Sequence, residues 1–555
     1  MIKRVAVYKL VKVTLIIPRS DLNNTVVRLC IFGKFHPSDD PELTEFYDLT
    51  LLKSKAHELY SNINQIISEP KAEEWQQQQA AHRRLEVPEP AAKEEKEEEE
   101  EVVLKANGLD DLLGKIENEV AVYRACRAET TLTKDSVRRL EVYRELALRI
   151  FSVLRRIKGR VDLRWFAGIE GYIPENELSR FRESFKDVLL FASPVAKLGA
   201  PPYVPTLLKN PRTIKLFEHV TLSLGSPKYS EVDPTPIIAF FFPIFYGMMF
   251  SDLGQGLLMF LLGLFLTRRK ESNFRYWGSI LAIFGVAASV SGFLTGDFFG
   301  FALGRPFPLI PVLRPQTFGT ESVIALLTLA IIIGTFHLAS GYVIALVNRI
   351  NSRDMFEASL NIFPTLLLYS SAIPLSMALI GVGLDPQDIL KSEEATPILS
   401  DYLGVRVPIA TVAFITIPLV VGSLLVIAFG RAVGALISPR RGVNPRSSLT
   451  EGIVDMIIRP IELLANTLSY TRLGILLIVH LLLMDLLNRA WGIGVAGLPL
   501  VVFGNVGVMA IEGLIVYIQD LRLHLYEWFT KFYEGAGVAF TALSLKTNGA
   551  TIKWI

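Results

Sequence analysis

Residues 466–480 read NTLSYTRLGILLIVH, and this stretch decides how the rest of the chain is interpreted. Arg472 is followed by the uncharged run LGILLIV and then by His480, and the nearest acids on either side are Glu462 and Asp485. The pattern is typical of a helix that crosses a membrane, where a permanent cation costs roughly 2.5–3.5 kcal/mol. We therefore expect Arg472 to serve a function.

The composition of the chain differs between its two ends. The 555 residues are 50% hydrophobic, with a mean hydropathy of +0.37. Residues 1–230 are rich in Lys, Arg and Glu, whereas residues 237–540 are mostly apolar. This split predicts a soluble N-terminal part followed by a polytopic membrane part. The net charge of +2 averages two unlike halves and gives no reason to expect a nucleic-acid partner.

Several classes of site lack support in the sequence. Cys30 and Cys126 are far apart and have no partner ligands nearby, so we expect two free thiols in a reducing compartment and no metal site. The first residues, MIKRVAVYKLVKVTLIIP, do not read as a cleavable signal, which favours a cytoplasmic N-terminal part. No phosphate-binding loop, dinucleotide fingerprint or nucleophile elbow is present, so no catalytic residue or cofactor is expected.

The N-terminal part, residues 1–232, reads as a small α/β lobe with a long antiparallel helical arm. The expected elements are strands 5–17 and 25–33, helix 43–66, helical segments 109–123 and 137–157, and a strand, turn and helix over 165–181. Residues of about 71–107, which include KEEKEEEEE, have no apolar period and are expected to form a disordered acidic tip. Such an arm suits docking or bracing.

The membrane part, residues 233–555, reads as an all-α domain of about eight spans. The apolar stretch 237–267 has 31 residues, whereas one span needs about 20. Ser251 and Asp252 interrupt it, which favours a tight hairpin that returns the RRK at 268–270 to the cytoplasm. The spans are 237–250, 253–267, 276–303, 322–347, 360–383, 408–436, 459–489 and 499–533.

The charges of the loops agree with eight spans and with both ends of the chain in the cytoplasm. The loop 384–407 is net acidic and is expected outside. Cytoplasmic loops should be basic. The residues that meet this rule are Arg349, Arg353, Arg440, Arg441, Arg446, Lys546 and Lys553. A single span over 237–267 would invert every later loop.

Polar residues gather in the last two spans. Ser469 and Arg472 share one helical face, and Glu512, Gln519 and Arg522 share another. We expect these faces to meet in a polar seam, with Glu512 as the buried partner of Arg522.

Other polar residues allow plainer interpretations. His480 is equally compatible with a buried core histidine, and Glu462, near the cytoplasmic entry of its span, with a hydrated side chain. Asp485 and Arg489 lie near the outer end of an expected span and read as interfacial. Asp252 and Asp297 lie at or near span ends and read as caps of turns.

Seven motifs together resemble the membrane-embedded a subunit of vacuolar-type and archaeal-type rotary ATPases, called subunit I in prokaryotes. The motifs are GYIPENEL at 171–178, the segment 201–236, PIFYGMMFSDLGQG at 243–256, TGDFFG at 295–300, GTFHLASG at 334–341, NTLSYTRL at 466–473, and 512–537. The resemblance implies that Arg472 is the essential arginine of the family, that Arg522 is its second helical arginine, and that His480 and Glu512 line the ion path.

The resemblance also implies a function. A rotating ring of proteolipid c subunits would pass the chain, two half-channels would meet at Arg472, and peripheral stalks would link the N-terminal part to the ATPase head. The chain would then be a non-catalytic, multi-pass subunit in an archaeal plasma membrane, translocating H⁺ or Na⁺. Residues 68–107 are too short for the distal lobe of the family. The alternatives are a stand-alone secondary transporter, which would need an internal repeat, and an intramembrane protease using Asp252 and Asp297.

Overall fold

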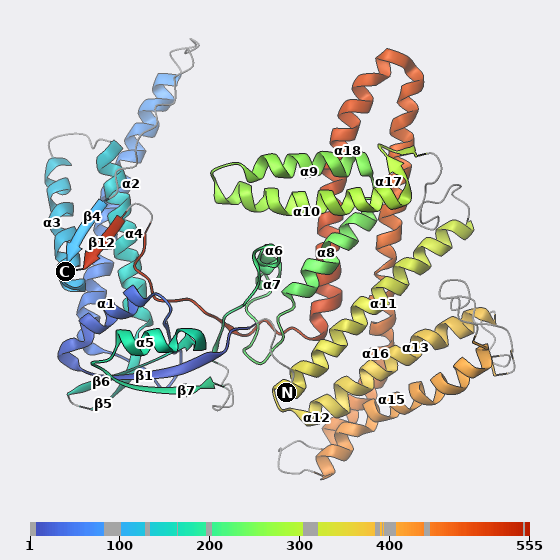
Figure 1. Ribbon diagram of the computed structural model, residues 1–555, viewed down its shortest axis with the longest axis horizontal. Coiled ribbons are helices and arrows are strands. Elements are labelled where there is room, and N and C mark those ends of the chain that lie inside the picture. Colours follow the sequence, from blue (N-terminus) through green and yellow to red (C-terminus); the bar gives the residue numbers. More distant parts are fainter. Residues whose placement is uncertain are drawn as a thin grey trace. The chain divides into compact units, whose positions relative to one another are not determined.

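The structure is a computed structural model (Figure 1). It describes residues 7–82, 102–127, 134–163, 165–195, 203–303, 320–382, 389–390, 392, 407–437, 445–547 and 550–554. The run KEEKEEEEE of the expected acidic tip, most of the expected outer loop 384–407, and Arg440 and Arg441 lie outside these residues.

The chain divides into two compact units. One comprises Val7–Leu207 together with Gly537–Ile555, and the other contains the intervening residues from Leu208. The expected division at residue 232 did not place the C-terminal segment in the first unit. A chain that leaves one unit outside the bilayer and returns to it crosses the bilayer an even number of times.

The first unit is built on an antiparallel sheet. Its long central strand, β1 (Leu10–Pro18), pairs with β6 (Phe166–Pro174) on one side and β7 (Leu189–Pro194) on the other. Alternate residues of β1 are fully buried, as a strand with one face on a core requires. The remaining strands of this sheet are β2 (His36–Pro37), β3 (Thr44–Glu45) and β5 (Lys158–Leu163).

The expected strand at 25–33 is wrong, because these residues lie in helix α1 (Leu22–Phe32). The β-branched residues Thr25, Val26 and Val27 favour a strand locally. Instead Leu22, Val26 and Leu29 are buried at helical spacing against the sheet. The helix ends at Gly33, whose φ of 66° is the left-handed conformation common at helix C-termini.

The helical arm is present. Helix α2 (Tyr47–His82) packs along α4 (Lys134–Arg156), and α3 (Leu109–Arg127) lies beside them. The pairing of β3 with β5 brings the start of α2 to the end of α4, so the two helices are antiparallel.

Two parts of the expected acidic tip have regular structure. Residues 71–82 continue α2, and β4 (Val102–Ala106) pairs in parallel with the C-terminal strand β12 (Ala550–Trp554). The polar residues after 70 gave no apolar period, yet the helix that begins at Tyr47 extends through them. The expectation of disorder is therefore wrong for residues 71–82 and 102–106.

The second unit is helical. Among the described residues, six segments are long and apolar enough to cross a membrane: Ser272–Thr295, Val323–Asn351, Met355–Ile380, Ile409–Gly434, Arg446–Asn488 and Leu498–Lys531. Two shorter apolar helices, α8 (Thr235–Met249) and α9 (Leu253–Thr267), precede them. This part is that of a multi-pass membrane protein, and the count of eight spans stays a prediction.

Three of these segments lie within single helices, and each of the other three combines consecutive helices. The α-helices concerned are α10 (Ser272–Thr295), α11 (Thr320–Asn351), α12 (Met355–Glu357), α13 (Phe363–Gly381), α15 (Ile409–Ile437), α16 (Pro445–Leu468), α17 (Thr471–Asn488) and α18 (Leu498–Arg522). A π-helix, η8 (Leu523–Trp528), and a 3₁₀ turn, η9 (Phe529–Lys531), extend α18. The hairpin β9 (Asp297–Phe298) and β10 (Phe301–Ala302) follows α10.

The interruption expected at Ser251 and Asp252 separates α8 from α9, and α9 packs closely along α10 (Figure 1). Glycines make this approach possible. A Cβ on Gly263 would lie 2.5 Å from the backbone nitrogen of Ala282, and one on Gly285 would lie 2.4 Å from that of Phe260. Small residues let helix backbones approach in membranes, where apolar burial between helices is a weak driving force.

Candidate functional site

The helix that carries Arg472 is not continuous. The predicted single span 459–489 is α16 followed by α17, with Ser469 and Tyr470 between them, and α16 begins earlier, at Pro445. Arg472 is therefore in the first turn of α17, with 19% of its side chain exposed.

The predicted span began at Arg459, whereas α16 begins at Pro445. In α16, Asp455 and Arg459 form an ion pair at 3.0 Å, and Arg431 of α15 lies 3.6 Å from the same aspartate. Paired in this way, the charges are compatible with a helix near the membrane surface.

A buried acid lies between the two arginines. Atom Oε1 of Glu527 is 3.8 Å from Nη1 of Arg472 and 3.9 Å from Nε of Arg522. The Glu527 side chain is only 6% exposed, whereas that of Arg522 is 57% exposed. The expected seam between the last two spans therefore exists, but its acid is Glu527, and we call these three residues the Arg–Glu–Arg triad.

Sequence periodicity missed Glu527 because of η8. In an α-helix the residue that shares a face with Arg522 is Tyr526, but Tyr526 is 69% exposed. The π-helix brings the residue five positions on, Glu527, next to Arg522 instead. Such π-helical turns occur often at functional sites. Nothing in the residue pattern marked this change of period.

His480 and Glu512 form a second buried pair. Nδ1 of His480 lies 2.9 Å from Oε2 of Glu512, and both side chains are at most 6% exposed. The expectation that Glu512 would pair with Arg522 is therefore wrong. The ring of Phe250 packs against His480, with 4.9 Å between ring centroids.

The remaining predicted residues lie around these two pairs. Ser469 donates its hydroxyl to the carbonyl of Ala465 at 3.0 Å. Glu462 is half exposed and accepts a hydrogen bond from Lys531. Gln519 is partly buried on α18.

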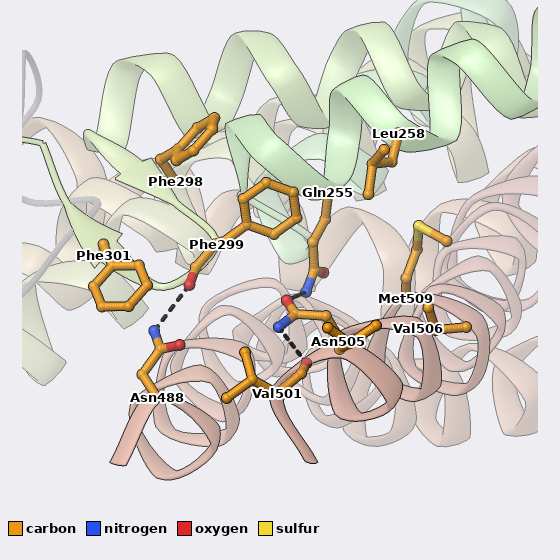
Figure 2. A pocket seen from close by; sticks show the side chains of 11 residues that line it. Gln255, Leu258, Phe298, Phe299, Phe301, Asn488, Val501, Asn505, Val506 and Met509 are labelled. Carbon is orange, nitrogen blue, oxygen red and sulfur yellow. Dashed lines mark hydrogen bonds between the residues drawn. The ribbon is translucent and has the colours of Figure 1, made fainter. Parts of the chain in front are cut away.

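A cavity of about 340 Å³ lies near the start of α18 (Figure 2). Its wall is mainly apolar, and Gln255, Asn488 and Asn505 supply its polar groups. The Gln255 amide donates to Asn505 at 2.9 Å, and Asn488 donates to the carbonyl of Phe299 at 2.8 Å. The Oε1 atom of Gln255 and the Oδ1 atom of Asn488 are buried without a hydrogen-bond partner among the described residues.

This cavity is one helical turn from the His480–Glu512 pair. Asn505, Met509 and Glu512 follow one another at four and three residues on one face of α18. On α17, Asn488 and His480 are eight residues apart and share a face.

A second cavity, of about 200 Å³, lies past the other end of α18, beyond η8, and is lined by charged groups that include Lys228, Glu231, Arg349, Lys531 and Glu534. Burial raises the pKa of the Glu231 carboxyl. The pKa of the Glu534 carboxyl is lowered, chiefly by its hydrogen bond with Lys228. The two cavities thus flank the stretch of helix that carries Glu512, Arg522 and Glu527.

Asp252 has a structural role, as its position at a span end suggested. Its carboxylate caps α9 by accepting from the backbone of Gln255 at 2.9 Å, and it also accepts from Phe299 at 3.1 Å and Gly300 at 3.0 Å. A carboxylate held by three backbone donors is poorly suited to act as the general base of a protease. Asp485 and Arg489 pair with each other at 2.9 Å and are mostly exposed, as expected of an interfacial pair.

The described ranges contain no group of three or more His, Cys, Asp or Glu side chains arranged to hold a metal ion.

Comparisons with known proteins confirm the resemblance read from the motifs. The model of the V-type ATPase 116 kDa subunit family matches residues 42–288. The A-type ATP synthase subunit I of Aeropyrum pernix is 28% identical over 438 residues, which cover 73% of this chain and 60% of that protein. Those of Saccharolobus solfataricus and Methanocaldococcus jannaschii are 26% and 25% identical, covering 79% and 78% of this chain. The chain spans 67% and 63% of these two relatives.

Proposed function

We propose that this chain, a homologue of archaeal A-type ATP synthase subunit I, is the stator a subunit of a rotary ATPase. In this role it supplies the arginine and the two half-channels beside a rotating proteolipid c ring. The observation that carries the proposal is the Arg–Glu–Arg triad, which holds a partly buried permanent cation at the seam of the last two spans. The chain itself is not catalytic. It couples ion movement to ATP synthesis or hydrolysis in the head of the complex.

The cation acts on the carboxylate of each ring subunit. A carboxylate that faces lipid must be neutral, because an unpaired charge there is too costly. Beside Arg472 the ionised form becomes favourable, since a unit charge pair about 4 Å apart is worth roughly 4 kcal/mol at an effective dielectric constant near 20. Arginine cannot lose its proton at this site, so it does not pass protons between the half-channels.

Glu527 supplies a counter-charge for Arg472 when no ring carboxylate is present. Oε1 of Glu527 is 3.8 Å from the guanidinium, which is longer than a hydrogen bond. A ring carboxylate that approaches Arg472 therefore competes with an acid that is held loosely. This competition limits the strength of the new ion pair, so that the ring carboxylate can leave again.

The two cavities, one near the start of α18 and one beyond η8, support separate access routes. The cavity at Gln255 and Asn505 leads to the His480–Glu512 pair and serves as the outer route. The charged cavity at Lys531 and Glu534 lies one turn beyond Glu527 and serves as the inner route. The triad lies between them and keeps the routes apart.

The first unit acts as the brace of the stator. It lies in the cytoplasm, the membrane is the plasma membrane, and peripheral stalk subunits bind its helical arm and link it to the ATPase head. The return of the C-terminal segment to this unit requires an even number of crossings, which supports placement of both ends on the same side of the membrane.

Replacement of Arg472 tests the proposal. In vesicles reconstituted with the complex, Arg472→Gln should reduce ATP-driven ion pumping to background while assembly is retained, and Arg472→Lys should restore little, because lysine can lose its proton when buried. The matched control is Arg489→Gln, since Arg489 is exposed and paired with Asp485. Substantial pumping by Arg472→Gln would refute the proposal. Failure of the chain to purify with a proteolipid ring would favour a stand-alone secondary transporter.

A further inference from the structure

The motif GTFHLASG, residues 334–341, lies in α11 and has no part in the ion path described so far. Gly334 and His337 are three residues apart and so lie on one side of the helix. This side of α11 contacts Tyr470 and Trp528, which are next to or near the charged residues of the triad in sequence.

Tyr470 lies two residues before Arg472, in the break between α16 and α17. Its side chain is fully buried, and its hydroxyl is 2.7 Å from Nδ1 of His337. A Cβ on Gly334 would lie 2.1 Å from Cγ of the tyrosine ring. The ring therefore packs directly on the backbone of α11, and the start of α17 is fixed by that contact.

Trp528 follows Glu527 directly and is also fully buried. Its indole Nε1 donates to the hydroxyl of Ser340 at 3.1 Å. Its ring stacks on His337, with 4.8 Å between centroids and 19° between planes. A Cβ on Gly341 would lie 3.0 Å from the indole, so α11 and Trp528 are in close contact there as well. His337 thus contacts both Tyr470, which lies near Arg472 in the chain, and Trp528, which follows Glu527.

The contact between Arg472 and Glu527 is too long to fix the distance between the two side chains. Nη1 of Arg472 and Oε1 of Glu527 are 3.8 Å apart, and Nη1 has no hydrogen-bond partner among the described residues. Their separation must come from the elements on which they lie. We propose that His337 is a positioning residue, which sets the spacing between Arg472 and Glu527 by holding Tyr470 and Trp528 on α11. This inference rests on the proposed function of Arg472.

The contact through Nδ1 makes a sharp test possible. The amide of asparagine can occupy the place of Nδ1, whereas the amide of glutamine reaches the place of Nε2. We therefore expect His337→Asn to retain more than half of the ions pumped per ATP hydrolysed in reconstituted vesicles. His337→Gln and Tyr470→Phe should lower that ratio at least threefold, because a displaced arginine allows ring carboxylates to pass without releasing their ions.

A second tyrosine provides the matched control. Tyr369 is also buried, and its hydroxyl lies 3.1 Å from that of Thr467 in α16. Tyr369→Phe removes the same oxygen and should lower thermal stability about as much as Tyr470→Phe, but it should leave the ratio of ions to ATP unchanged.

The outcomes separate this inference from the proposed function. Equal ratios for His337→Asn and His337→Gln, or equal losses for Tyr470→Phe and Tyr369→Phe, would overturn the positioning role. If the His337 variants fail to assemble, Tyr470→Phe decides the question, since it removes one oxygen only. A full ratio of ions to ATP in Arg472→Gln would instead overturn the proposed function.

Discussion

Replacing Glu527 by glutamine should slow ion transport without uncoupling it. The carboxylate lies 3.8 Å from Arg472 and 3.9 Å from Arg522, and its side chain is 6% exposed. Glutamine keeps the shape and removes the charge. Arg472 then has no counter-charge, and on the proposed mechanism it binds each ring carboxylate more strongly and releases it more slowly.

The size of the effect follows from the distances. The pair with Arg472 is worth roughly 4 kcal/mol before desolvation is counted, at an effective dielectric constant near 20. The pair with Arg522 adds at most about 1 kcal/mol, because the Arg522 side chain is 57% exposed. If a third of the first term is transferred to the ring carboxylate, release slows about tenfold, since roughly 1.4 kcal/mol corresponds to a factor of ten.

The assay is ATP-driven pumping in reconstituted vesicles, with ATP hydrolysis measured in parallel. We expect Glu527→Gln to lower both rates together, with unchanged ions per ATP. Asp455→Asn is the control. Asp455 also lies between two arginines, Arg431 and Arg459, but outside the proposed ion path, and its side chain is 31% exposed. It should change the rates less than twofold. A normal rate for Glu527→Gln in a well-assembled complex, or a loss of coupling, would refute the reasoning.

Glu512→Gln and His480→Ala should each slow transport without abolishing it, because water partly replaces a lost polar group in a wet path. Since these residues share one contact of 2.9 Å, the double variant should be no slower than the slower single variant, and additive losses would contradict the pairing. Gly285→Ala should destabilise the protein in a thermal assay by about 1–3 kcal/mol, because a Cβ there would lie 2.4 Å from a backbone nitrogen of α9. Gly422→Ala, where a Cβ meets nothing within 4 Å, should be silent, and equal effects would exclude close α9–α10 packing as the cause. A cysteine at Arg269 should react with a membrane-impermeant maleimide only from the cytoplasmic side. Labelling from outside would refute the eight-span topology.

The arginines of the site could be predicted because their cost is local. A permanent cation in an apolar helix is unfavourable wherever the helix packs, so Arg472 stands out in the sequence alone. Arg522 stands out for the same reason. Glu527 lies in the mixed run LYEWFTKFYEG, where an acid is unremarkable, and only the π-helix η8 places it beside the arginines.

Pairings between segments far apart in the chain could not be predicted from the sequence. Periodicity shows which residues share a face, but which faces meet depends on how α17 and α18 are aligned along their length. His480 could therefore not be matched to Glu512 before the structure was known. The pairing of β12 with β4 joins two five-residue strands that lie at Ala550–Trp554 and Val102–Ala106, and neither has an alternation long enough to predict it.

The two ionic contacts along α18 differ in a way that fits their places in the proposed path. Imidazole and carboxyl groups can both exchange protons, so on the proposed mechanism with H⁺ as the coupling ion the pair His480–Glu512 relays a proton from the outer cavity. The triad contains two arginines, and neither can release a proton, so its charge is fixed. A proton that enters from outside therefore meets the His480–Glu512 pair, which can relay it, before it meets the Arg–Glu–Arg triad, whose arginines cannot. On this arrangement the route past Arg472 is blocked by the fixed positive charge of its side chain rather than by close packing. An enlarged side chain near the triad should then slow transport, whereas loss or displacement of the arginine should make it leak.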